Sequence, residues 1–211
     1  MPLIELATLR LHPSLSSSPP PPSFSELWTK CLEITSSASG IPFQLYRSTS
    51  DAQLFYLLGG WQTADDHIAF LSSSEAVDLA KAIGQFTTVD IVRHIDGDVA
   101  LLGANRPQRL VVTAYKVPSA SASIDAWKEQ WKPKDGAGGW DESAAVQKQH
   151  EAFKQMGEVT HSASAFGGNE SSGVKTWVWI EDATKKVDSG SRILENSKVE
   201  AESVEVEYFI G

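Results

Sequence analysis

One order of predicted elements occurs twice in this chain: strand, helix, two strands, helix, strand. The first copy spans residues 1–104 and the second spans residues 105–211. A single unit of this kind covers one face of its sheet with helices and leaves the opposite face open. Two units in one chain can bury their open faces against each other, and this requirement constrains the fold more than any single motif.

The strands of the first copy are indicated by alternation with a period of two. Leu3–Leu11 and Thr88–Ile95 are predicted as its first and last strands. Between them, Phe43–Arg47 and Leu54–Trp61 are predicted as a strand pair joined by a polar turn.

Capping signals place the helices of the first copy. We expect the first helix to begin at Ser23 or Ser25 and to end at Gly40. Thr63 is expected to cap the second helix, and the serines at Ser72–Ser74 predict a break within it.

The second copy repeats this order with a longer interruption. Its predicted strands are Arg109–Val117, Glu158–Phe166, Val174–Glu181 and Ser203–Ile210. The glycine-rich run Gly136–Trp140 is interpreted as a loop or lid. The predicted fold class is α+β, with two tandem ferredoxin-like (βαββαβ) repeats packed sheet to sheet into an α+β barrel. We expect the functional site in the cavity that the two sheets enclose.

Composition excludes several classes of partner. The net charge is −9, which argues against nucleic acid, and no apolar run approaches the ~20 residues of a membrane span. The single cysteine, Cys31, cannot form an internal disulfide and fits a reducing compartment. No signal peptide is evident, so we expect a cytoplasmic protein.

A barrel closed within one chain predicts a monomer that is an intrachain pseudo-dimer, although further dimerisation through outer faces stays open.

The stretch LFYLLGGWQTADDHIAFLSSSEAVDLAKAI, Leu54–Ile83, resembles the antibiotic-biosynthesis-monooxygenase-like group of the dimeric α+β barrel superfamily. The matching features are an apolar strand ending in Trp61, a polar turn, His67 early in a helix, and then Phe70. The resemblance implies a barrel of two ferredoxin-like units. It also implies an activity among cofactor-independent quinol monooxygenases, polyketide cyclases, haem-degrading enzymes or stress-responsive proteins. The second copy lacks the Trp–turn–His signature, which predicts one specialised pocket rather than two equal ones.

Histidines are the candidate acid–base groups, because imidazole exchanges a proton near neutral pH. The chain has His12, His67, His94, His150 and His161. His94 and His161 lie within predicted strands of opposite copies, so they could converge if both faced the cavity. We expect His94 to act as a general base, with His161 or Tyr115 holding the resulting oxyanion.

Aromatic residues are the candidate ligand-binding groups. Trp177 and Trp179 share one strand face, and the aliphatic residues on the other face suit helix packing, which leaves the indoles for the cavity or the barrel seam. The predicted substrate-binding residues are Tyr56, Trp61, His67, Trp177 and Trp179. The histidines show no metal-binding spacing and the lone cysteine cannot build a thiolate site, so neither a metal nor another cofactor is expected.

Three functions stay open at this point. The first is a cofactor-independent monooxygenase- or cyclase-like enzyme acting on an apolar aromatic or polyketide-like small molecule. The second is a non-catalytic small-molecule-binding or stress-responsive barrel protein. The third and weaker one is a haem-binding relative, with His94 or His161 as the axial ligand.

Overall fold

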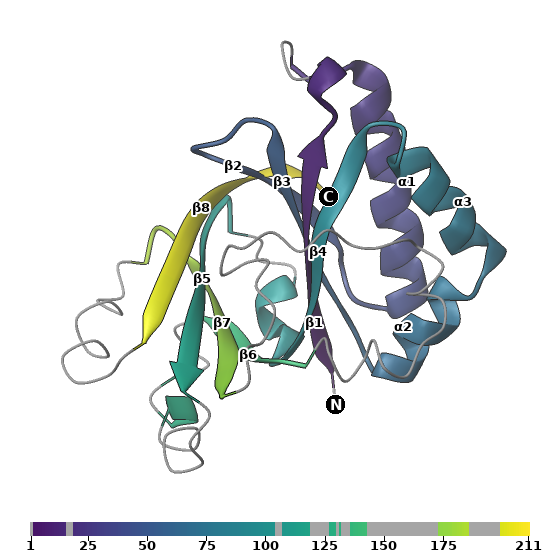
Figure 1. The fold of residues 1–211 in the computed structure, drawn as a ribbon. Coiled ribbons are helices and arrows are strands. Elements are labelled where there is room, and N and C mark those ends of the chain that lie inside the picture. Colours follow the sequence, from purple (N-terminus) through teal and green to yellow (C-terminus); the bar gives the residue numbers. More distant parts are fainter. Residues whose placement is uncertain are drawn as a thin grey trace.

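Eight antiparallel strands close into a barrel in the part of the chain that this computed structural model describes (Figure 1). The described residues are 2–15, 19–103, 107–118, 127–129, 131, 136–142, 173–185 and 199–211. The strands are β1 (Leu3–Leu11), β2 (Gln44–Ser48), β3 (Leu54–Trp61), β4 (Thr87–Asp96), β5 (Arg109–Pro118), β6 (Ala137–Asp141), β7 (Val174–Asp182) and β8 (Glu200–Ile210). This arrangement confirms an α+β barrel.

The order of strands around the barrel is the same in its two halves. The N-terminal strands follow one another as β4-β1-β3-β2, and the C-terminal strands follow as β8-β5-β7-β6. Within each half this is fourth, first, third, second. The halves join where β2 pairs with β8 and where β4 pairs with β6. The β4–β6 junction contains two aligned residue pairs, against nine between β1 and β4.

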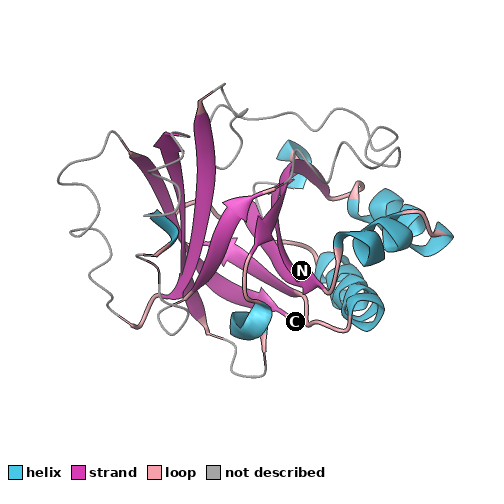
Figure 2. Cartoon of the chain, turned by 90° about the horizontal axis from the view of Figure 1, so that it is seen from below, coloured by secondary structure: helices cyan, strands magenta, loops and turns pink. Residues whose placement is uncertain are grey.

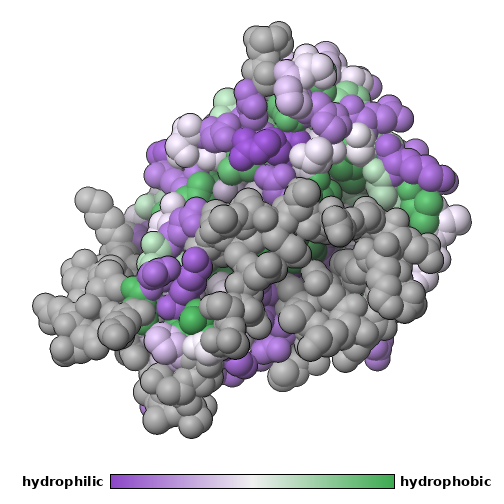
Figure 3. Space-filling view, viewed as in Figure 1, coloured by the Kyte–Doolittle hydropathy of each residue, from purple (hydrophilic) through white to green (hydrophobic). Residues whose placement is uncertain are grey.

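Three α-helices in the described part of the chain lie outside the barrel, against its N-terminal half (Figure 2). They are α1 (Pro22–Ser39), α2 (Ala64–Leu71) and α3 (Ser74–Ile83). The structure also contains two short 3₁₀ helices, η1 (Pro13–Leu15) and η2 (Val99–Leu102). Among the described residues, no helix has the length and apolarity needed to cross a membrane. Polar residues cover most of the described surface in Figure 3.

Local capping signals set most of the helix ends. The hydroxyl of Thr63 accepts a hydrogen bond from the Asp66 amide, and Ser73 caps α3 in the same way, so the predicted break is confirmed. Gly40 ends α1 in the left-handed region at φ 69°, as expected. The predicted serine cap of α1 is wrong. The helix begins at Pro22, because proline already holds a helical φ and lacks an amide that would need a partner there.

Alternation along the strands separates an inner face from an outer face. Ile4 and Leu6 of β1 point inward, whereas Leu9 points outward beneath α1. The inward side chains form one buried cluster: Ile4, Leu6, Ile41, Tyr46, Tyr56, Leu58, Ile95, Leu102, Leu110, Val112, Ala114, Ala137, Val178, Ile180 and Val206. These packed side chains lie in the region where the cavity between the sheets was expected. The predicted substrate-binding residue Tyr56 belongs to this cluster, and its burial raises the pKa of its hydroxyl.

The glycine-rich run that was interpreted as a loop or lid is strand β6, so that interpretation is wrong. It lies between β4 and β7, where backbones approach closely. A Cβ atom on Gly139 would lie 1.6 Å from the Asp96 carbonyl oxygen, and one on Gly138 would lie 2.1 Å from that of Val178. Glycine is required here because any side chain would displace the neighbouring strand. The predicted strand at Glu158–Phe166 lies outside the described residues.

A buried ion pair crosses the short β4–β6 junction. The guanidinium of Arg93 donates to the carboxylate of Asp141, and the two side chains are 2% and 8% exposed. Arg93 aligns with Leu6 of β1, so it points into the barrel interior. Removing a charge from water costs free energy. Each member of this pair lowers the cost of burying the other.

We predict that Asp141→Asn lowers the free energy of unfolding by about 3–5 kcal/mol, because it removes the carboxylate charge that stabilises the buried guanidinium of Arg93. Urea titration followed by circular dichroism measures the change. The control is Asp78→Asn, since Asp78 pairs with Lys81 at 3.8 Å on an exposed helix surface. An exposed pair contributes about 0–1 kcal/mol. Equal effects of the two substitutions would show that the interior pair does not hold the junction.

Candidate functional site

A carboxylate interrupts the apolar outer face of β1. Glu5 stands between Ile4 and Leu6, which both point into the barrel, so its own side chain points outward. It is 8% exposed. The strand register sets it directly opposite His94 of β4. Sequence analysis missed Glu5, although a single acid within an apolar strand was a signal that could have identified it.

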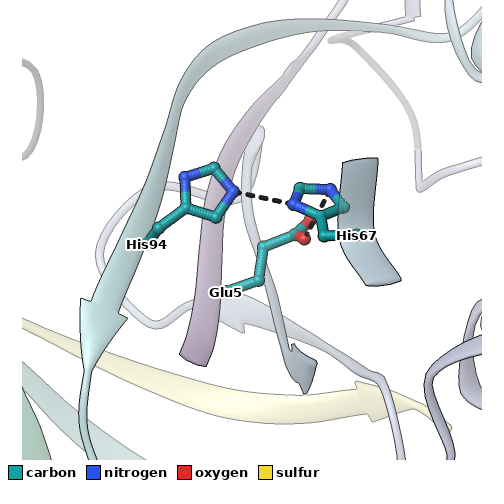
Figure 4. A group of neighbouring side chains, drawn as sticks. All are labelled: Glu5, His67 and His94. Carbon is teal, nitrogen blue, oxygen red and sulfur yellow. Dashed lines mark hydrogen bonds and ion pairs between the residues drawn. The ribbon is translucent and has the colours of Figure 1, made fainter. Parts of the chain in front are cut away.

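Three buried side chains from three elements form a hydrogen-bonded chain on this face (Figure 4). His94 Nε2 lies 3.0 Å from His67 Nδ1, and His67 Nε2 lies 3.2 Å from Glu5 Oε2. His67 comes from α2 and is 3% exposed, while His94 is fully buried. The imidazole of His67 thus connects the carboxylate on β1 with the second imidazole on β4.

Trp61 at the end of β3 holds this chain in place. Its indole N–H donates a 2.6 Å hydrogen bond to Glu5 Oε2. Its ring also stacks on His67, with centroids 4.6 Å apart and planes 18° from parallel. Trp61 and His67, the two residues of the sequence signature, therefore contact each other. The contacts of both residues with Glu5 were not predicted from the sequence.

Burial shifts the pKa of both end groups toward their neutral forms. It raises the pKa of Glu5, against the opposing effects of the His94 charge and the Trp61 hydrogen bond. It lowers the pKa of His94 to about 4, although the Glu5 charge acts in the other direction. His94 is therefore neutral at pH 7. A proton on His67 Nε2, which lies 3.2 Å from the Glu5 carboxylate, would leave the His67 Nδ1 lone pair to accept from the His94 Nε2–H group.

The same three side chains are a candidate metal-binding group in the described part of the chain. One ligand atom from each lies within 4.8 Å of the others, and two histidines with one carboxylate suit a transition metal. However, His67 presents opposite ring nitrogens to its two partners. A metal bound at one of these nitrogens would displace the contact that this nitrogen now makes. The geometry as it stands fits proton transfer better than metal coordination.

The structure corrects the expected position of His94. Sequence analysis allowed His94 to meet His161 inside the barrel. His94 instead lies on the outer face beneath α2, because it alternates with the inward residues Arg93 and Ile95. His161 lies outside the described residues, so its expected role stays a prediction.

The expected position of the tryptophans is also corrected. Trp177 and Trp179 point away from the barrel interior, since Val178 and Ile180 between them take the inward positions. The aliphatic face was expected to meet helices, but it faces the opposite sheet. The indoles join an outer aromatic cluster: Tyr115, Trp127, Trp131, Trp140, Trp177 and Trp179.

Tyr115 is buried within this outer cluster. Its ring lies 5.4 Å from that of Trp127 and 5.2 Å from that of Trp131. Burial and the nearby charge of Glu181 raise the pKa of its hydroxyl.

In the same region the Trp179 indole donates a 3.1 Å hydrogen bond to Glu181. Each half of the barrel therefore has a buried indole–carboxylate pair.

A pocket of about 470 Å³ opens beside the outer aromatic cluster. Trp131, Trp177 and Trp179 form its wall, and β6 contributes backbone at Gly138. Asp96 of β4 also lines it. Asp96 lies two residues beyond His94 on the same strand face, a distance of about 7 Å along the strand. Asp96 at the pocket and the buried His94 therefore lie on the same, outer face of β4.

Comparison with known proteins supports the fold. No family model matches the sequence, and no curated protein matches it significantly. Among solved structures, the chain is similar to a "putative monooxygenase" from Lactobacillus acidophilus NCFM, with a TM-score of 0.53 and 9% sequence identity. The match covers 98% of this chain and 93% of that one. At this identity the likeness shows a shared barrel fold.

We predict that His94 makes the protein less stable in acid. Its pKa of about 4 in the folded state lies below the usual value of 6.5, so the unfolded chain binds more protons between these values. This contribution is complete above pH 6.5 and is lost as the pH falls toward 4, up to about 3 kcal/mol.

Urea titrations between pH 4.5 and 7 of the wild type and of His94→Gln measure this contribution. Glu5 acts in the opposite direction, because its raised pKa favours the folded state at low pH. For that reason the test compares the free energy of unfolding of the two proteins at each pH. The wild type should gain stability relative to His94→Gln as the pH rises. A difference that does not depend on pH would contradict the neutral, buried state of His94.

Proposed function

We propose that this chain is a monooxygenase- or cyclase-like enzyme that acts on an aromatic small molecule without a cofactor, with His94 as its general base. The observation that carries the proposal is the buried chain from His94 through His67 to Glu5, on the same outer face as a pocket walled by tryptophans. The similarity in fold to a "putative monooxygenase" agrees with this reaction class.

The proposal includes a tandem-repeat origin of the barrel. The repeated order of fourth, first, third and second strand is the order expected of two ferredoxin-like units. The two halves pair edge to edge within one chain, which supports a monomer acting as an intrachain pseudo-dimer. The boundary between the repeats, after residue 104, remains part of the proposal.

The hydrogen-bonded chain compensates for the low basicity of an isolated buried histidine. A proton taken from a substrate C–H or O–H group at His94 Nδ1 releases the Nε2 proton to His67 Nδ1. His67 then passes its Nε2 proton to Glu5. The positive charge does not stay on a desolvated imidazole, because the proton ends on a carboxylate whose pKa burial has raised.

The deprotonated substrate would then react with O₂ or close a ring in an aldol-type step, since both reactions begin with loss of this proton. Tyr115 would hold the developing oxyanion. Its raised pKa keeps the hydroxyl protonated and able to donate, and its ring contacts Trp131 of the pocket wall. The pocket residue Asp96 lies two residues beyond His94 on the same face of β4, about 7 Å along the strand, which supports an approach to the base from this pocket.

A second function is favoured by the complete burial of His94. A general base needs access to its substrate, whereas a structural hydrogen-bonded chain does not. On this alternative the protein is a non-catalytic binder that keeps the barrel and uses the three side chains only to hold α2 against β1 and β4. Turnover measurements on matched variants separate the two functions.

We expect His94→Gln to lower kcat about 10²–10⁴-fold on a substrate with an acidic phenol, because general-base catalysis typically contributes that factor. Glu5→Gln should lower kcat in the same direction, since an amide cannot accept the relayed proton. Oxygen uptake and product absorbance under steady-state conditions measure both effects.

His12→Gln is the matched control, because His12 lies outside the chain of hydrogen bonds and is bound to the Gly84 carbonyl. It should leave kcat unchanged. Circular dichroism and urea titration of each variant separate loss of chemistry from loss of folding. Full turnover by folded His94→Gln would overturn the proposed mechanism.

A further inference from the structure

The outer pocket has features that its position beside the proposed base does not explain. Three indoles form its wall, and the ring of Trp131 lies 4.6 Å from that of Trp179 and 6.1 Å from that of Trp177. The volume of about 470 Å³ falls in the usual range for small-molecule sites. These large planar walls suit a flat ring.

Among the described residues that line the pocket, the charged side chains are acidic on balance. Asp96 and Asp98 line it with carboxylates, whereas Lys128 is the only basic residue among the described lining residues. The whole chain carries a net charge of −9, so the surrounding potential also favours a cation. An anionic ligand would meet both carboxylates, so charge discriminates against it.

The aromatic cluster already holds one cation. The ammonium group of Lys175 lies 5.9 Å from the centre of the Trp140 ring, and that ring contacts Trp177 at 5.0 Å. A positive charge over an indole face is stabilised by the negative potential of the ring. The pocket brings further indoles, such as that of Trp131, together with the carboxylate of Asp96.

A buried polar group supports the presence of an occupant. Trp177 is 3% exposed and lines the pocket, and its indole N–H has no hydrogen-bond partner among the described residues. An unsatisfied buried donor costs roughly 1–3 kcal/mol. A molecule with an acceptor atom near this ring would offset that cost.

We propose that this pocket binds a planar aromatic molecule that carries a positive charge, such as a protonated arylalkyl amine. This inference replaces the expected apolar aromatic ligand with an aromatic ligand that carries a positive charge. The assignment of such a ligand as the substrate rests on the proposed function, whereas its binding does not.

Isothermal titration calorimetry at low ionic strength tests the proposal with three probes that share one ring. Tryptamine carries a positive charge, 3-methylindole is neutral and indole-3-propionate carries a negative charge. We expect tryptamine to bind about tenfold more tightly than 3-methylindole, and indole-3-propionate to bind most weakly.

Two substitutions of opposite sign isolate the role of charge. Asp96→Asn should weaken tryptamine binding toward the level of 3-methylindole, and Lys128→Gln should strengthen it. Asp78→Asn is the control, because it removes an equal charge from the exposed surface of α3. Trp131→Leu should weaken all three probes. Equal affinity for the three probes, or unchanged tryptamine binding in Asp96→Asn, would overturn the proposal.

Binding is measured without turnover, so this test and the test of the proposed function fail separately. Loss of charge selectivity would leave the kinetic effect of His94→Gln untouched. Conversely, selective binding of tryptamine with full activity in His94→Gln would keep the pocket assignment and remove the general base.

Discussion

Closure of the barrel is the constraint on which the rest of this structure depends. A closed sheet has no free edge, and it separates every strand into an inward and an outward face. The inward face is taken up by one apolar cluster and by the Arg93–Asp141 pair at the β4–β6 junction. Side chains with other chemistry are therefore directed to the outer face, where α2 covers Glu5 and His94, and where Trp177 and Trp179 line a pocket.

The two halves use the same backbone order for different purposes. In the N-terminal half, an indole on β3 and an imidazole on α2 both contact a carboxylate on β1. In the C-terminal half, Trp179 donates to Glu181 of its own strand, and the surrounding rings leave a pocket. A buried carboxylate is expensive unless hydrogen bonds compensate for the lost water. Both pairs meet this requirement, and the first continues through His67 to His94.

Local signals predicted the elements of the N-terminal half well. Thr63, Ser73 and Gly40 act through contacts within a few residues, so the sequence alone indicates them. Strand β6 was missed because its glycines normally indicate a loop. Their actual cause is the close approach of β4 and β7, which are distant in sequence.

The site was harder to predict because its contacts are long-range. Trp61 and Glu5 are separated by 56 residues, and the meeting of His67 with His94 depends on how α2 crosses the sheet. The face of β7 was assigned wrongly for another reason. Its two faces are both apolar, so alternation alone does not say whether Val178 or Trp177 points inward.

The most direct test of the hydrogen-bonded chain is the protonation state of its imidazole nitrogens. NMR spectra of the protein labelled with ¹⁵N in its histidine rings report this state for each nitrogen at a chosen pH. At pH 6 the account predicts a neutral His94, and a His67 with its proton on Nε2 and a lone pair on Nδ1. A His94 that titrates with an ordinary pKa near 6.5, or a His67 with its proton on Nδ1, would contradict it.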